Sequence, residues 1–119
     1  EARGELDLVR RDGVTLKSDV LVVPHHGSRT SSTPAFIAAV APQIAVFTPG
    51  YRNRFGHPRP DVVARYDDAG VRTYRTDYDG ALTFVFAPGV SRAPRAERDH
   101  DRRYWRDAPK REAAAVTTE

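Results

Sequence analysis

Residues 19–28 set the architecture of this chain, and they read Asp19-Val20-Leu21-Val22-Val23-Pro24-His25-His26-Gly27-Ser28. After Asp19 the first half is a run of apolar, mostly β-branched residues, which predicts a strand buried on both faces. The second half brings two histidines, a glycine and a serine directly after that strand. Ligands of α/β proteins gather at the carboxyl ends of the strands, and imidazole is the commonest side-chain metal ligand. The stretch therefore predicts a buried strand that delivers two histidines to a site.

Two adjacent histidines after a strand also occur as plain surface or capping residues, so their context decides between the two interpretations. Gly27 permits a sharp turn or a close backbone approach, and Ser28 can both donate and accept hydrogen bonds. A third histidine, His57, follows the next predicted strand in a similar position. This context favours a functional site.

Length and composition limit what the chain can be. Its 119 residues make one domain at most. It begins at Glu1 and contains no Met, and we expect it to be a piece of a longer protein. It has no Cys, which excludes disulfides, thiolate metal sites and a cysteine nucleophile and leaves histidine and carboxylate as the strong metal ligands. No apolar run approaches the roughly 20 residues that span a bilayer. The net charge of +3 mildly favours anionic partners.

Strands and helices are predicted to alternate along most of the chain. Strands joined by a helical crossover pair in parallel, and an Asp-Gly turn favours an antiparallel hairpin. The predicted class is α/β (α+β), with helices packed on one face of a mixed sheet. The predicted elements are, in order, a helix within 1–13, a strand at 19–23, a helix at Pro34–Val40 capped by Thr33, a strand at 43–48, a helix from Pro60 that ends before Gly70, a strand at 71–76, a tight turn at 77–80 and a strand at 81–86.

The character of the chain changes near residue 88. Residues 89–119 carry many charges of both signs and few apolar groups. We predict a domain over residues 1–88 followed by a charged tail over residues 89–119. The tail is either flexible or a solvated helix around Ala96–Arg106, since mixed charge is typical of solvent-facing segments.

The two loops that follow the predicted strands carry the residues that could bind a metal ion. Adjacent parallel strands lie about 4.8 Å apart, so His25 and His26 from one loop and His57 from the next can converge. Two or three imidazoles with carboxylates suit Zn²⁺ or Mn²⁺. Nothing in the chain completes such a coordination shell, so either a part outside the chain completes it or the residues form no metal site.

Four arginines, Arg29, Arg52, Arg54 and Arg59, share these loops with the histidines. Guanidinium groups pair with phosphate through two hydrogen bonds. Tyr51 and Phe55 lie among the arginines and are able to stack on bases of single-stranded nucleic acid. The alternative is that the loops are polar only because they are exposed.

Four segments together carry a resemblance to a known family: Val23-Pro24-His25-His26-Gly27-Ser28, then Thr30-Ser31-Ser32, then Asn53-Arg54-Phe55-Gly56-His57-Pro58, and finally Arg75-Thr76-Asp77-Tyr78-Asp79-Gly80. In this order and spacing they resemble the C-terminal metallo-β-lactamase-like domain of the ComEC family of DNA internalization-related competence proteins. The resemblance covers residues 1–86. It implies the C-terminal half of an αββα sandwich, whose upstream HxHxDH and Gly-Asp motifs this chain does not contain.

The resemblance also implies roles for individual residues. His25 and His26 belong to a two-metal centre of Mn or Zn, although which of them is the ligand stays open. His57 is catalytic, either as a proton donor or as a further ligand or phosphate contact. The substrate phosphate is expected to be bound by four residues, Ser28, Arg29, Asn53 and Arg54.

The function implied by the resemblance is uptake of transforming DNA, with metal-dependent phosphodiester hydrolysis in the intact domain and an inactive fragment. The implied partner is single-stranded DNA, and no small-molecule cofactor is expected. The longer protein is expected in the cell membrane, attached through segments outside this chain, with this domain on the extracytoplasmic side. Two alternatives remain: a stand-alone hydrolase of a small ester with the same fold, which has no need of four nearby arginines, and a non-catalytic DNA-binding piece.

Overall fold

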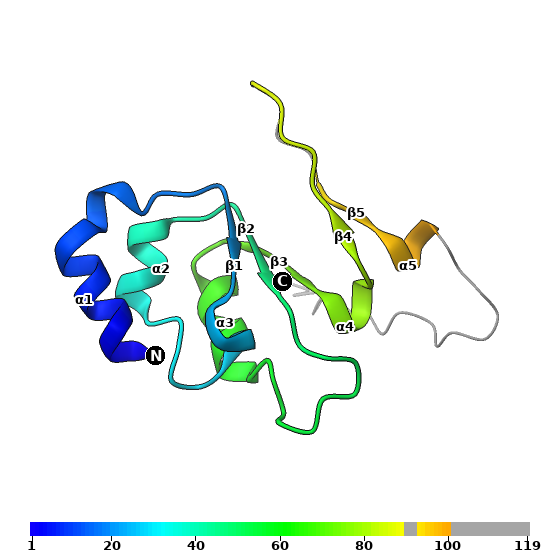
Figure 1. Cartoon of the computed structure of the whole chain (residues 1–119), viewed down its shortest axis with the longest axis horizontal. Coiled ribbons are helices and arrows are strands. Elements are labelled where there is room, and N and C mark those ends of the chain that lie inside the picture. The colour runs from blue at the N-terminus through cyan, green and yellow to red at the C-terminus, as the bar shows by residue number, and fades with distance from the viewer. Residues whose placement is uncertain (90–92, 101–119) are drawn as a thin grey trace, which may run out of the picture. The chain divides into compact units, whose positions relative to one another are not determined.

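The computed structural model describes residues 1–89 and 93–100, which are divided between two compact units (Figure 1). The first unit is Glu1–Asp77, and the second begins at Tyr78. Within the described residues no helix is both long and apolar enough to cross a membrane.

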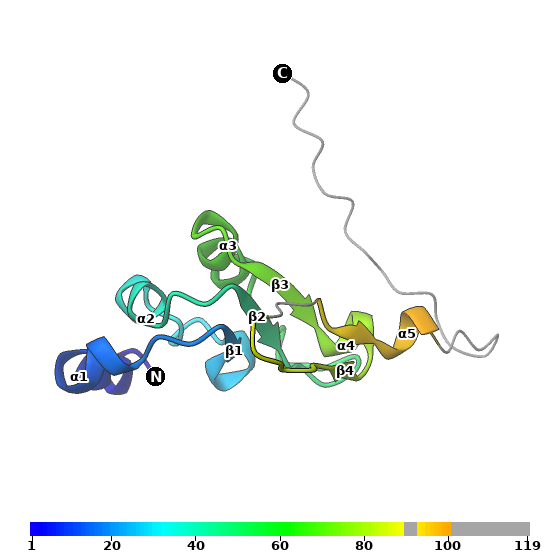
Figure 2. The ribbon, with the colours of Figure 1, turned by 90° about the horizontal axis from the view of Figure 1, so that it is seen from above.

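A three-stranded parallel sheet forms the centre of the first unit. Its strands are β1 (Val20–Val22), β2 (Ile44–Phe47) and β3 (Arg72–Arg75), in the spatial order β1-β2-β3. The crossover helices are α2 (Pro34–Val40) and α3 (Pro60–Asp68), and both lie on the same face of the sheet (Figure 2). This arrangement confirms the predicted α/β class and the placement of helices on one face.

The remaining elements of the first unit lead into β1 and away from it. Helix α1 (Ala2–Asp12) packs against α2, and the short 3₁₀ helix η1 (Gly13–Thr15) connects α1 to β1. A second 3₁₀ turn, η2 (Pro24–Gly27), follows β1 and contains the histidine pair.

Helix α2 forms where its sequence signals predicted it. The Thr33 hydroxyl accepts a hydrogen bond from the Phe36 amide at 3.3 Å, and Pro34 occupies the first helical position. Ala41 ends the helix in a left-handed conformation (φ 42°), and Pro42 follows. Its buried side chains are Phe36, Ile37 and Val40.

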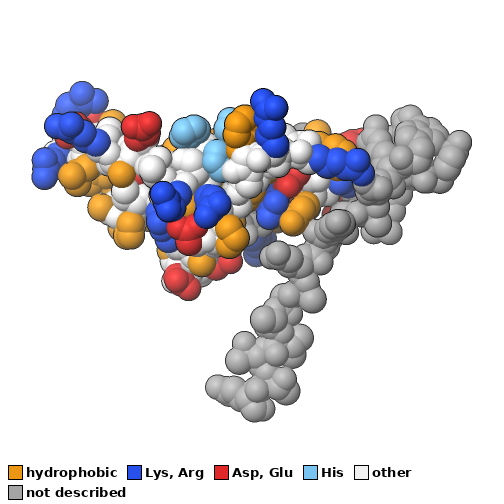
Figure 3. Space-filling model, turned by 90° about the horizontal axis from the view of Figure 1, so that it is seen from below, with side chains coloured by type: hydrophobic (Ala, Val, Ile, Leu, Met, Phe, Trp, Pro, Cys, Tyr) orange, Lys and Arg blue, Asp and Glu red, His pale blue; other side chains and the backbone are white. Residues whose placement is uncertain are grey.

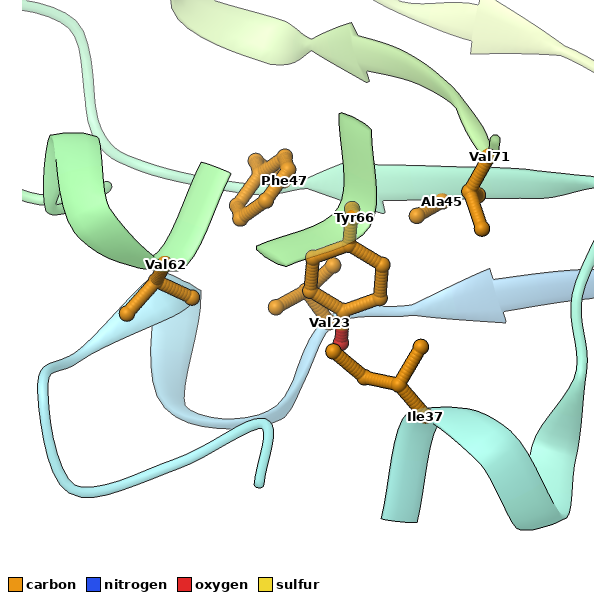
Figure 4. Packing of buried hydrophobic residues seen from close by; sticks show 7 residues of the cluster. All are labelled: Val23, Ile37, Ala45, Phe47, Val62, Tyr66 and Val71. Carbon is orange, nitrogen blue, oxygen red and sulfur yellow. The ribbon is translucent and has the colours of Figure 1, made fainter. Parts of the chain in front are cut away.

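The core lies between the sheet and the helices α2 and α3 (Figure 4). Alternate residues of β2, Ala45 and Phe47, point toward the helices, as the two-residue period of a strand requires. The Tyr66 ring meets the Phe47 ring edge-on, with centroids 5.5 Å apart and an interplanar angle of 86°. The cluster consists of Val23, Ile37, Ala45, Phe47, Val62, Tyr66 and Val71.

The prediction that the strand at 19–23 is buried on both faces is wrong. In the described sheet β1 is an outer strand, and its residues run from half-buried to exposed, with Val22 62% exposed. The central strand β2 is the one that is buried throughout. An apolar run reports a strand, but it does not tell a central strand from an outer one.

The predicted hairpin between 71–76 and 81–86 is also wrong. Residues Thr76–Asp79 form a short helix, α4, in place of a tight turn. The following strand, β4 (Leu82–Thr83), pairs antiparallel with β5 (Arg95–Ala96) and not with β3. The parallel and antiparallel pairs therefore belong to two separate sheets, where a single mixed sheet was expected.

The second unit ends its described part with α5 (Glu97–His100). Phe84 and Phe86, which follow β4, stack with ring centroids 6.2 Å apart. The domain boundary at 88/89 stays a prediction. Most of the predicted tail helix, Ala96–Arg106, lies outside the described residues.

Candidate functional site

The histidine pair follows β1 in an unusual backbone conformation. His25 and His26 are consecutive left-handed residues, with φ 50° and 54°. Nδ1 of His25 lies 3.2 Å from the Ser28 hydroxyl, and Nδ1 of His26 lies 3.0 Å from the Thr48 hydroxyl at the end of β2. Each imidazole is thus oriented through Nδ1, which leaves Nε2 to meet a ligand.

The loop after β2 is closed by the side chain of Asn53. Its amide nitrogen donates to the His57 carbonyl at 2.7 Å, and its amide oxygen accepts from the His57 backbone N–H at 3.1 Å. The peptide bond between His57 and Pro58 is cis. Asn53 therefore shapes the backbone that carries His57, while its predicted contact with phosphate stays a prediction.

Gly27 and Pro58 hold the two loops together. A Cβ atom on Gly27 (φ 81°) would lie 2.7 Å from the Pro58 Cβ and 2.8 Å from the Phe47 Cδ1, so only glycine fits between them. The Gly27 carbonyl also accepts a hydrogen bond from the Arg59 amide at 3.0 Å. This contact brings His25 and His57 together, with ring centroids 6.0 Å apart and an interplanar angle of 70°.

A buried polar clamp holds the segment that follows Ser28. The Glu5 side chain, in a residue only 6% exposed, accepts hydrogen bonds from the Ser32 amide at 2.7 Å and the Thr33 amide at 2.8 Å. Arg65 donates to the carbonyls of Ser31 and Ser32 at 3.1 and 3.2 Å. The clamp therefore joins α1, α3 and the histidine loop.

The clamp was missed by sequence reasoning. In an amphipathic helix a lone glutamate among exposed charges looks solvent-facing, and no local pattern marks Glu5 as buried. The signal that exists is indirect and concerns the Thr33 amide alone: Thr33 is the N-cap of α2, and the N–H groups at the start of a helix have no partner within it.

Tyr66 gives the clamp a pH-dependent contribution. Its hydroxyl lies 2.8 Å from the Ser32 hydroxyl inside the core. Burial raises the pKa of the Tyr66 phenol above its usual 10.0, while the hydrogen bond to Ser32 acts in the opposite direction. Because the folded chain holds this proton more tightly than the unfolded chain, the stabilisation is complete below the unfolded pKa and is lost as the pH rises toward the folded pKa.

Tyr66→Phe is expected to lower the free energy of unfolding by about 1–2 kcal/mol near neutral pH, because the buried Ser32 hydroxyl loses its partner. The difference between the variant and the wild type should shrink as the pH rises above about 10. Urea unfolding of both proteins across this pH range measures it. A difference that stays constant with pH would contradict the assignment.

The remaining predicted site residues differ in their surroundings. Ser28 is buried beside His25, whereas Arg29 and Arg54 are exposed. The Arg54 guanidinium lies 5.4 Å from the centroid of the Phe55 ring. Figure 3 shows histidine side chains gathered on one face, beside hydrophobic and Lys or Arg side chains.

The donor set of the site fits part of a metal centre. The imidazoles of His25 and His57, with ring centroids 6.0 Å apart, are close enough to reach one ion, since a zinc–nitrogen bond is about 2.0–2.1 Å. Among residues 1–89 and 93–100, no cluster of three or more His, Cys, Asp or Glu is placed to hold an ion. The predicted two-metal centre with His25 and His26 stays a prediction.

The chain is similar in sequence to two bacterial proteins that are named for competence. It is 40% identical over 109 residues to the competence protein ComA of Neisseria gonorrhoeae and 36% identical over 71 residues to the ComE operon protein 3 of Bacillus subtilis strain 168. It is also 31% identical over 87 residues to the uncharacterised protein YcaI of Escherichia coli K12. No protein-family model and no solved structure matches the chain.

These alignments cover most of the chain but little of the relatives. The three matches take in 92%, 60% and 73% of the chain, and they span 16%, 9% and 12% of the respective relatives. The chain is thus similar to segments of proteins that are named for competence. More particularly, it is similar to one segment of the gonococcal ComA protein.

Proposed function

We propose that this chain is part of a protein for uptake of transforming DNA, and that its two loops form part of a metal-dependent phosphodiesterase site. The observation that carries the proposal is the approach of His25 and His57, from separate loops, at the carboxyl edge of a parallel sheet. Ligand sites of α/β sheets lie at this edge. The similarity to two competence proteins supports DNA as the partner.

The loop residues support distinct tasks in such a site. His25 and His26 would hold a divalent ion through Nε2, each oriented by a hydroxyl group on Nδ1. A bound divalent ion supplies Lewis-acid chemistry and an activated water. His57 would give or take a proton at the phosphodiester, and Asn53 holds the His57 backbone in place. Arg29 and Arg54, both exposed, would pair with phosphate oxygens.

The relatives are much longer than the region they share with this chain, and this supports a site completed by other segments of a longer protein. We propose that those segments provide the remaining metal ligands, as in a metallo-β-lactamase-like domain, together with the attachment to the membrane. The chain would then lie on the extracytoplasmic side, where incoming DNA is met.

The test is an assay of the longer protein on labelled single-stranded DNA with Mn²⁺ or Zn²⁺. We expect metal-dependent cleavage, and the double variant His25→Ala, His26→Ala should lower it by at least about 100-fold, since even outer-shell changes at metal sites cost 10–100-fold. His100→Ala is the matched control, because His100 lies in neither loop, and it should cleave like the wild type.

Three results would count against the proposal. Equal cleavage by the double variant would remove the histidines from the centre. Hydrolysis of small esters but not of DNA would favour the alternative of a small-molecule hydrolase. Binding of DNA without any cleavage would favour a non-catalytic DNA-binding piece.

A further inference from the structure

One aromatic side chain at the edge of the site is largely exposed. Phe55 is 68% exposed, although its ring is a large apolar surface that folding normally buries. Its ring lies beside His57, with centroids 6.3 Å apart and an interplanar angle of 31°. On the same loop Tyr51 is 54% exposed. The loop therefore presents flat rings next to a proposed catalytic group.

The charge around these rings has one sign. The segments 24–33 and 49–60 contain Arg29, Arg52, Arg54 and Arg59, and neither contains an Asp or a Glu. The whole chain, in contrast, has 19 basic and 16 acidic residues, so the two loops are positive against a nearly balanced background. The guanidinium groups of Arg52 and Arg54 lie over the rings of Tyr51 and Phe55, at 5.2 and 5.4 Å from the centroids.

The loop that presents Phe55 is fixed at several points. The Asn53 side chain bonds both backbone groups of His57, and the Asn53 backbone N–H donates to the Gly50 carbonyl at 3.1 Å. The Thr76 hydroxyl donates to the Pro49 carbonyl at 3.2 Å. Because the loop is held before binding, little conformational entropy is lost when a ligand meets the ring.

We propose that Phe55 is a stacking surface for one unpaired base of single-stranded DNA, and that the neighbouring arginines hold the flanking phosphates. The inference rests on the proposed function in taking DNA as the partner, and it adds the residue that selects the strand form. Exposed aromatic rings set among positive charges are the combination by which proteins bind single strands without sequence preference.

The geometry selects a single strand over a duplex. In a duplex both faces of each base are covered by its neighbours, so a base cannot lie on Phe55 unless it leaves the stack. An unpaired base offers its face at no such cost, and the ring of Phe55 then places the adjoining phosphate close to His57.

The experiment measures binding by the 119-residue chain in the presence of EDTA, so that metal chemistry plays no part. Fluorescence anisotropy compares a labelled oligothymidine with an abasic oligonucleotide of the same length and charge. The wild type should bind the oligothymidine at least about fivefold more tightly, as one stacked base contributes. Phe55→Leu should bind both equally, and Phe55→Trp should keep the preference.

Val14→Ala serves as the control for loss of an exposed apolar side chain. Val14 is 97% exposed and lies before β1, at the opposite edge of the sheet from the loops, so its removal should change neither affinity. The inference is overturned if the wild type fails to bind, if it binds both oligonucleotides equally, or if Phe55→Leu keeps the preference. If the chain prefers the oligothymidine but the longer protein cleaves no DNA, the stacking role of Phe55 stands and only the proposed nuclease is refuted. If the longer protein cleaves DNA but the chain shows no such preference, the proposed nuclease stands and the stacking role of Phe55 is refuted.

Discussion

Gly27→Ala is expected to lower the free energy of unfolding of the first unit by about 2–5 kcal/mol. Two costs add at this position. A non-glycine residue at φ 81° is strained, and the new Cβ would overlap the Pro58 Cβ at 2.7 Å and the Phe47 ring at 2.8 Å. Neither neighbour can move easily, because Phe47 is fully buried in the core and Pro58 is held by its ring.

Gly70→Ala separates these two costs in the same fold. Gly70 also has a positive φ, 73°, but no atom lies within 4 Å of the position that its Cβ would take. Gly70→Ala should therefore lower the free energy of unfolding only by the cost of the left-handed conformation, about 1–2 kcal/mol. Urea unfolding of both variants measures the difference. Equal losses would mean that the two loops do not press together at Gly27.

Glu5→Ala is expected to lower the free energy of unfolding by about 2–4 kcal/mol, because the amides of Ser32 and Thr33 lose their acceptors. The Ser32 amide should also exchange its hydrogen faster, since it is no longer bonded. Glu5→Gln keeps one acceptor oxygen, so its free energy of unfolding should lie between those of Glu5→Ala and the wild type. Unfolding curves together with amide hydrogen exchange measure both effects.

Asp7→Ala is the matched control for Glu5→Ala, since it removes an exposed carboxylate from the same helix. It should leave the free energy of unfolding close to that of the wild type. If Glu5→Ala behaves like Asp7→Ala, the clamp contributes nothing and the segment after Ser28 is held by other contacts.

Signals that act within a few residues of the chain predicted the structure well. Thr33 and Pro34 begin α2, Pro60 begins α3, and Gly70 follows α3 with a positive φ, each as its residue type favours. The positions of the histidines after β1 and β2 also followed from the strand pattern, because the side chains after parallel strands meet at one edge of the sheet.

Features that depend on distant parts of the chain could not be predicted in this way. The pairing of β4 with β5 depends on a segment more than ten residues later, which overrides the local Asp-Gly hairpin signal. The burial of Glu5 depends on amides 27 and 28 residues away. The exposure of Val22 depends on which strand lies at the outside of the sheet. Spacing alone carries none of this information.

The two left-handed histidines set a limit on how stable this region can become. A left-handed conformation costs a non-glycine residue about 1–2 kcal/mol, and His25 and His26 bear that cost side by side. Glycine at either position would relieve it but would remove an imidazole. Any search for stabilising substitutions in η2 will therefore favour those that remove an imidazole from the proposed site, as is expected where a backbone is held in a rare conformation.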